Sequence, residues 1–303
     1  MPYVFHKSES VANAAQRVAR ELLDDTLEMI RNPDVTLDVR THEARKAIKK
    51  LRGLLRLAEP SSHRGPTDRE IDKELRDAAR KLAPFRDSDV MRAALQTAAK
   101  SSHGLIDDDV ADKIHAAITE GTSVEASTQA VSLALYATDV TSIGDKLAAS
   151  EISTKNLATL EASYLNTCNK AYTLLQKVLA GNPAEEDFHR WRKFVKYHFY
   201  HTRLLARIYG KRARKRAKDA NALEEVLGEH HDLAVLVERI RARRRKIRKF
   251  CDVDRLTGYM VARQLTLEEE ALELGRRLFP KEAKSAEELF LDYAAEGSGK
   301  DDG

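Results

Sequence analysis

The eight-residue pattern H-x-x-R-K-x-x-K occurs twice in this chain, and this repetition strongly restricts the folds open to it. The pattern begins at His42 and again at His189, an offset of 147 residues, and each copy follows an Asn-Pro pair. A second pair of segments, centred on Asp87 and Asp232, recurs in the same order at an offset of 145 residues. Two motifs that repeat in register predict a duplicated structural unit.

Helical periodicity runs through almost the whole chain. Apolar residues recur at spacings of three and four, whereas alternation of apolar and polar residues is never sustained for more than a few residues. Only 13 of the 303 residues are glycine and 7 are proline, about 4% and 2%, against usual shares of roughly 7% and 5%. A sheet-rich fold needs more of these turn residues. We therefore predict an all-α fold.

The repeat divides this fold into two related helical bundles. We predict one domain over residues 1–295, with a first half at about 8–140 and a second half at about 154–295. Segment 138–153 is small, polar and weakly periodic, which favours a junction between the halves. Residues 296–303 are expected to be a disordered tail. The predicted helices span about 8–30, 36–58, 68–82, 88–100, 107–120, 123–136, 154–179, 184–209, 219–228, 231–250, 254–278 and 283–294.

The first copy of the pattern lies on a helix with one basic and one apolar face. A row of cations at steps of three and four falls within about 80° of His42 on the helical circumference, and two further lysines flank it. Residues 40–56 hold seven Lys or Arg residues and one acid, Glu43. The candidate binding residues on this helix are His42, Arg45, Lys46, Lys49, Lys50, Arg52 and Arg56.

The second copy repeats this arrangement. Its candidate binding residues are His189, Arg192, Lys193, Lys196, Tyr200, Arg203 and Arg207. Trp191, Val195 and His198 lie roughly opposite them and predict the buried face. The phenol of Tyr200 lies within the row of cations, where it can donate a hydrogen bond to an anionic oxygen or pack against the aliphatic stem of an arginine.

Two rows of like charge at repeat-equivalent positions predict a polyanionic ligand. Exposed helices that only need solubility usually interleave opposite charges at spacings of three and four. These rows do not, so their charges repel one another unless a ligand neutralises them. The chain has 52 Lys or Arg residues against 48 Asp or Glu, a net charge of +4, so the acids lie elsewhere and the charge is segregated. The simpler alternative is that each row is a solvated surface.

The basic helices resemble the characteristic helix of the CHAD family. The resemblance rests on the two pattern copies and on the segments at Asp87 and Asp232, and it extends over about residues 8–295. It implies an all-helical fold of two related bundles around a basic central cavity that binds inorganic polyphosphate. It also implies an association with polyphosphate granules in bacteria and archaea. No strand-rich segment like a CYTH triphosphatase domain is predicted here, so a stand-alone module is expected.

The resemblance adds Arg86 to the candidate binding residues. The second half of the chain departs from the family pattern in two places. Tyr197 and Phe199 stand where the first copy has two cations, and His231 stands at the position that corresponds to Arg86. The second half is therefore expected to contribute fewer cations to the cavity.

Motifs for catalysis and metal binding are missing from the sequence. It has no HExxH, no cysteine pair with zinc spacing, no glycine-rich phosphate loop and no GxSxG. His231 and Asp232 form an H-D pair, so a metal-dependent phosphohydrolase is an alternative to simple binding. His198 and His201 fall near the apolar face, where a core histidine is more common than a metal ligand. Asp87 and Asp232 are expected to orient nearby cations or to cap helices. We predict no catalytic residue, no metal and no cofactor.

Two arginine-rich runs, 211–216 and 241–249, offer nucleic acid as an alternative partner. Such runs are typical of nucleic-acid surfaces and equally of solvated helix surfaces. No helix-turn-helix or other reading module accompanies them, so polyphosphate is the preferred partner.

The apolar runs, the N-terminus and the cysteines indicate the cellular compartment. The apolar runs are too short for a membrane span, and the N-terminus lacks the apolar segment of a signal peptide. The two cysteines, Cys168 and Cys251, are typical of buried thiols in a reducing compartment. We expect a cytoplasmic protein without a membrane partner, while the sequence leaves its oligomeric state open.

Overall fold

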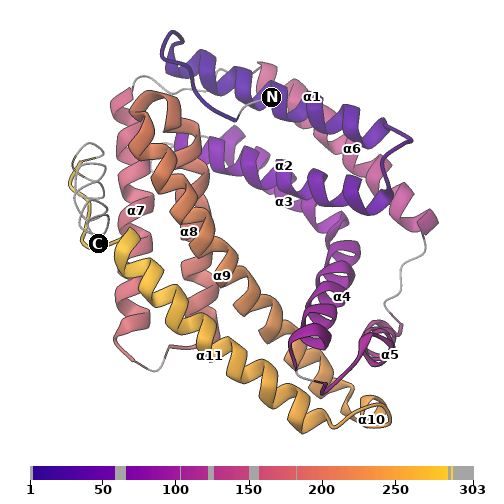
Figure 1. The fold of residues 1–303 in the computed structure, drawn as a ribbon. Coiled ribbons are helices and arrows are strands. Elements are labelled where there is room, and N and C mark those ends of the chain that lie inside the picture. Colours follow the sequence, from indigo (N-terminus) through magenta and orange to yellow (C-terminus); the bar gives the residue numbers. More distant parts are fainter. Residues whose placement is uncertain are drawn as a thin grey trace.

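The structure, a computed structural model, describes residues 3–58, 66–102, 104–121, 126–149, 157–181, 183–285 and 288. Within these ranges it contains eleven α-helices and no strand, which confirms the all-α prediction (Figure 1). The helices are α1 (Val11–Arg31), α2 (Leu37–Ala58), α3 (Pro66–Lys81), α4 (Ala83–Ser101), α5 (Asp108–Thr119), α6 (Ala126–Ala149), α7 (Leu157–Leu179), α8 (Glu185–Tyr209), α9 (Lys211–Ala242), α10 (Arg244–Ile247) and α11 (Val253–Leu278).

The helices form two groups that meet along α2 and α8. In the first group α1, α2, α3 and α6 pack on one another, and in the second group α7, α8, α9 and α11 do so. Helix α2 contacts α7 and α8, while α4 leaves the first group and contacts α9. Helices α2, α4 and α9 therefore lie along three sides of a triangle in Figure 1. Internal duplication of the two groups stays a prediction.

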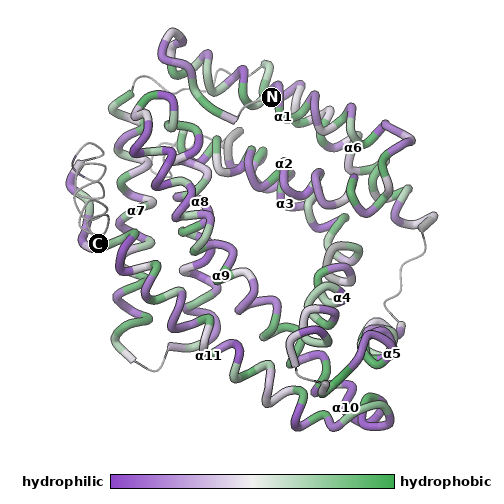
Figure 2. Tube along the Cα trace, in the orientation of Figure 1, coloured by the Kyte–Doolittle hydropathy of each residue, from purple (hydrophilic) through white to green (hydrophobic). Residues whose placement is uncertain are grey.

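Most helices bury one face and expose the other. Figure 2 shows hydrophobic and hydrophilic residues alternating along them, as expected for amphipathic helices. The main core is built from α1, α2, α3, α6 to α9 and the C-terminal part of α11, and a second core joins α4, α5, α9, α10 and the rest of α11. Among the described helices, none combines the length and apolarity needed to cross a bilayer.

Several predicted boundaries were wrong. Helix α1 begins at Val11 and not near Ser8, because the side chain of Ser10 accepts a hydrogen bond from the backbone N–H of Asn13 at 3.2 Å and caps the helix. Helix α6 continues to Ala149 through most of the predicted junction. Three buried residues of that segment, Val140, Ile143 and Leu147, pack into the main core at helical spacing. The small polar residues between them weaken the periodicity.

Helix α9 is a single helix where two were predicted. The expected break followed Gly228, yet the helix runs from Lys211 to Ala242 without interruption. A Cβ atom at Gly228 would lie 3.3 Å from Nη2 of Arg192, so the glycine makes room for that guanidinium rather than ending the helix. Most of the helix predicted over 283–294, and the whole tail 296–303, lie outside the described residues.

The packing of Trp191 on α11 leads to a stability prediction. A Cβ atom at Gly275 would lie 2.6 Å from Cζ2 and 2.8 Å from Cη2 of the fully buried Trp191. Gly275→Ala should therefore overpack the core and lower the free energy of unfolding by about 1–3 kcal/mol, as measured by denaturant titration. Gly258→Ala on the same helix is the control, since no atom lies within 4 Å of that Cβ position. It should be neutral, or stabilising by up to about 1 kcal/mol. Equal effects of the two changes would contradict this prediction.

Candidate anion-binding site

Helices α2 and α8 cross closely at Gly53. A Cβ atom at Gly53 would lie only 3.1 Å from Cβ of Tyr200, so a larger residue would push the helices apart. The imidazole Nε2 of His201 lies 3.0 Å from the carbonyl oxygen of Gly53, within a fully buried contact. This crossing brings the basic faces of the two helices together.

Four of the predicted cations meet beside the crossing. Arg45 and Lys49 come from α2, and Arg192 and Lys196 come from α8; we call them the four-cation cluster. Partial burial, followed by the charges of Lys196, Arg45 and Arg192, lowers the pKa of Lys49 from 10.5 to about 7. The side chain of Lys49 still reaches solvent, so a ligand can reach it. The cluster joins positions that are 147 residues apart in the sequence, 45 with 192 and 49 with 196.

A carboxylate from α9 lies against this cluster. Oε1 of Glu224 lies 2.5 Å from Nζ of Lys196 and 3.3 Å from Nη2 of Arg192. Burial lowers the pKa of Lys196, and the charge of Glu224 acts against that shift. Glu224 is not among the residues predicted from the sequence, because it lies 28 residues beyond Lys196 on a different helix.

A second group of cations, Lys46, Lys50 and Arg203, forms around the same crossing. Burial lowers the pKa of Lys50, and the charges of Lys46 and Arg203 lower it further. Lys46 also lies 3.0 Å from Oε1 of Glu43. Lys196 precedes Tyr200 on α8 by about one turn and Arg203 follows it by about one turn. Two groups of cations therefore adjoin a single contact between α2 and α8.

The other predicted site residues are engaged elsewhere or stand apart. Arg52 forms an ion pair with Asp72 of α3 at 2.8 Å, and the guanidinium of Arg56 lies 4.5 Å from the ring centroid of Tyr197. Arg207 contacts Nδ1 of His6 at 2.7 Å. The side chains of His42, Lys193 and His189 are exposed, and the side chain of Arg86 lies outside the described part of the chain.

The structure places Tyr200 in the packed crossing. Its ring meets the ring of Tyr3 edge-on at a centroid distance of 6.1 Å, and it is only 5% exposed. Burial is the main reason why the pKa of Tyr200 is raised. Packing is thus the observed role of Tyr200, and a hydrogen bond from its phenol to an anion stays a prediction.

The N-terminal segment, which was not predicted to belong to the site, crosses this region. The hydroxyl of Tyr3 donates to the carbonyl of Lys50 at 2.7 Å, and the N–H of Phe5 donates to the carbonyl of Leu204 at 2.8 Å. Both aromatic side chains are buried. The segment therefore links α2 to α8 beside Lys50. The only signal for it in the sequence is the aromatic pair itself.

The histidines fall into two environments. His198 and His201 are fully buried, as predicted for core residues, and Nε2 of His198 accepts a hydrogen bond from Nε of Arg216 at 2.9 Å. The ring of His231 lies 4.9 Å from the ring of His189, at the edge of the basic face. In the described part of the chain, no three His, Cys, Asp or Glu residues are grouped so that they could hold a metal ion.

The prediction that Asp87 and Asp232 cap helices was wrong. Asp87 lies inside α4 and Asp232 lies inside α9, because both helices begin earlier than predicted. The alternative role fits Asp232, whose charge raises the pKa of the nearby Lys196.

The two arginine-rich runs differ from each other. Arg216, in the run 211–216, is fully buried and donates through Nη2 to the carbonyl of Leu278 at 2.7 Å, so part of this run belongs to the core. The run 241–249 is exposed except for Ile247. Two of its cations pair with acids: Arg244 with Asp254 and Lys246 with Glu120.

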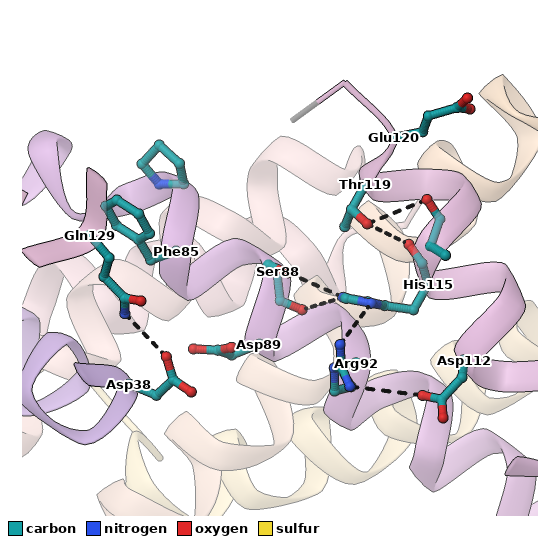
Figure 3. Close-up of a pocket in the computed structure, with 12 residues that line it drawn as sticks. Asp38, Phe85, Ser88, Asp89, Arg92, Asp112, His115, Thr119, Glu120 and Gln129 are labelled. Carbon is teal, nitrogen blue, oxygen red and sulfur yellow. Dashed lines mark hydrogen bonds and ion pairs between the residues drawn. The ribbon is translucent and has the colours of Figure 1, made fainter. Parts of the chain in front are cut away.

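A pocket of about 480 Å³ lies between α4, α5 and the starts of α2 and α6 (Figure 3), and its lining includes no member of the four-cation cluster. Its wall includes the carboxyl groups of Asp38, Asp89, Asp112 and Glu120. Arg92 supplies the opposing charge, 3.9 Å from Asp112. This balance of charge is unfavourable for a polyanion, so the pocket is not a candidate for the predicted ligand.

Comparisons with known proteins agree with this fold. The family model of the CHAD domain matches residues 10–241. The structure is similar to the crystal structure of the CHAD domain from the plant Ricinus communis, with a TM-score of 0.62 over 94% of this chain and 96% of that chain, at 18% sequence identity. At this identity the likeness concerns the fold alone. No curated protein matches the sequence.

Proposed function

Because the chain belongs to the CHAD family, we propose that it binds inorganic polyphosphate at the four-cation cluster. The observation that carries this proposal is the close crossing of α2 and α8 at Gly53, which brings Arg192 and Lys196 to the basic face of α2. The pKa of Lys49, lowered to about 7 by desolvation and by three neighbouring cations, agrees with it. Holding these like charges close together costs electrostatic free energy, so the cluster favours a ligand that supplies negative charge. A polyphosphate chain supplies such charge at regular intervals.

The second group of cations supports a chain rather than a single anion. Lys46, Lys50 and Arg203 adjoin the same helix crossing, so a chain of linked phosphates can engage both groups at once. Orthophosphate can engage only one of them. Once one phosphate of a chain is bound, the chain holds its other phosphates near the second group of cations, so the second contact forms as an intramolecular step and strengthens binding.

We propose binding without hydrolysis, in a cytoplasmic protein that associates with polyphosphate granules. No motif in the sequence supplies a catalytic group. The pair considered for a phosphohydrolase lies beside two cations of the cluster. Burial and the charge of Arg192 lower the pKa of His231, and the charge of Asp232 acts to raise the pKa of Lys196. Their proposed role is to adjust the charge of the anion site.

A direct comparison of ligands tests the proposal. Long-chain polyphosphate, orthophosphate, single-stranded RNA and duplex DNA are titrated into the protein at one salt concentration, and the polyphosphate titration is repeated across salt concentrations. Polyphosphate should bind tightest, and its affinity should fall with salt as counterions are released. Orthophosphate should compete poorly.

The same samples decide between the alternatives. Incubation with polyphosphate and Mg²⁺, Mn²⁺ or Zn²⁺ should release no more phosphate than a blank. Metal-dependent release that His231→Ala or Asp232→Ala abolishes would establish a phosphohydrolase. Tighter binding of RNA or DNA than of polyphosphate would favour a nucleic-acid partner on the exposed run 241–249.

A further inference from the structure

The carboxylate of Glu224 lies where an anionic ligand would bind. Its Oε1 contacts two members of the four-cation cluster, Lys196 at 2.5 Å and Arg192 at 3.3 Å. The side chains of all three residues are partly buried, with exposures of 15% for Glu224, 20% for Lys196 and 24% for Arg192. Charge-assisted contacts at such distances are strong where water is scarce. An incoming phosphate oxygen would need the same two donors.

In the first half of the chain, a different group occupies the position that corresponds to the carboxylate of Glu224. Nη1 of Arg45 donates to the backbone carbonyl of Ala79 at 3.0 Å. Ala79 precedes Glu224 by 145 residues, the offset that also relates Asp87 to Asp232. The position that corresponds to Glu224 thus offers a backbone carbonyl to Arg45, whereas Glu224 offers a side-chain carboxylate to Arg192.

Glu224 also offsets the repulsion within the cluster when no ligand is present. Its charge raises the pKa of Lys49 and of Lys196, against the effects of burial and of neighbouring cations. It thus stabilises the ligand-free protein and competes with any external anion for the same donors. A ligand must replace this internal contact before it gains its own.

We propose that Glu224 is an internal counter-ion that polyphosphate displaces, so that a ligand binds tightly only when its other contacts offset the loss of this ion pair. The inference rests on the proposed function. A long chain offsets this loss because it also engages Lys46, Lys50 and Arg203. A single phosphate pays the same free energy to displace Glu224 but has fewer contacts to offset it, so its binding is weak.

Glu224→Gln tests the proposal, with Glu225→Gln as the matched control. Both changes remove one negative charge from α9, but Glu225 is exposed, and its carboxylate accepts a hydrogen bond from the side-chain amide of Asn221 at 2.7 Å. Glu224→Gln should bind orthophosphate, tripolyphosphate and long-chain polyphosphate each about tenfold or more tightly than the wild type, as expected when a competing charge-assisted contact is removed. Glu225→Gln should change all three affinities by less than about twofold.

The possible outcomes separate this inference from the proposed function. Equal or weaker binding by Glu224→Gln than by Glu225→Gln would overturn the role of Glu224, since a merely structural residue loses affinity when it is replaced. Wild-type protein that binds no polyphosphate would instead overturn the proposed function. If Glu224→Gln does not fold, the double variant Lys49→Gln/Glu224→Gln removes one cation as well. It should still bind tripolyphosphate more tightly than Lys49→Gln alone, and equal or weaker binding would overturn the proposal.

Discussion

Replacing Lys49 with glutamate is expected to weaken the binding of long-chain polyphosphate by about ten- to a hundredfold. A hydrogen bond to a charged group is worth about 1.5–3 kcal/mol, and the new carboxylate adds repulsion of the ligand. Lys49 itself is exposed, but the loss should be larger than at an isolated surface cation, because the neighbouring Arg192 and Lys196 side chains are only 24% and 20% exposed. Isothermal titration calorimetry at a fixed salt concentration measures it.

The control is neutralisation of three exposed cations in the run 211–216. Lys211, Arg212 and Arg214 are exposed, so their joint replacement by glutamine should lower affinity by less than about fivefold and act mainly on the association rate. Binding that is lost in this control and retained in Lys49→Glu would move the site to the protein surface.

Thermal unfolding separates lost binding from lost folding. Ligand-free Lys49→Glu should be as stable as the wild type or more stable, because the change removes one cation from a group that repels itself. The same does not hold for Lys196 or Arg192, since each forms an ion pair with Glu224. Lys49 is therefore the cleanest position for this experiment.

Polyphosphate binding is expected to take up a proton at Lys49. The ligand-free pKa of Lys49 is about 7, so at pH 8 most molecules carry a neutral Lys49. A bound polyanion favours the charged amine and raises this pKa. Affinity should therefore be highest below pH 7 and should fall as the pH rises above 7, by up to about tenfold per pH unit for one linked proton. Calorimetry in two buffers with different ionisation enthalpies measures the uptake directly.

Lys49→Arg is the control for this pH dependence. Arginine keeps its charge at every pH in the experiment, so the variant should bind polyphosphate with little proton uptake between pH 7 and 9. A wild-type affinity that does not change over this range, or a variant that shows the same slope, would contradict the assignment to Lys49.

Much of the fold could be predicted because helix formation is largely a local matter. Spacings of three and four residues placed the basic face of α2 opposite its buried face, where Ala44, Leu51 and Leu55 lie. The same argument predicted Trp191, Val195 and His198 as buried on α8, and all three are fully buried. Boundaries failed where small residues blurred the periodicity, as in α6, or where Gly228 serves packing rather than a helix end.

The candidate site was predicted only in part, because a row of cations on one helix does not reveal its neighbours. Arg52 belonged to the predicted row, yet Asp72 of α3 neutralises it. Arg216 belonged to a run that looked solvated, yet it donates to His198 and to the carbonyl of Leu278 in the core. In both cases the partner comes from another helix. Periodicity within one helix carries no record of such partners.

The sequence by itself determined the all-helical fold, the two basic faces and the residues that point away from them, since each follows from contacts within about one helical turn. Only the tertiary structure decided which cations meet. Gly53 lets α2 and α8 cross closely enough for Lys49 to lie beside Lys196, and the pairing of α8 with α9 brings Glu224 to the same place. The physical reason is that the electrostatics of the site depend on distances between residues far apart in the chain, which packing sets and local periodicity does not.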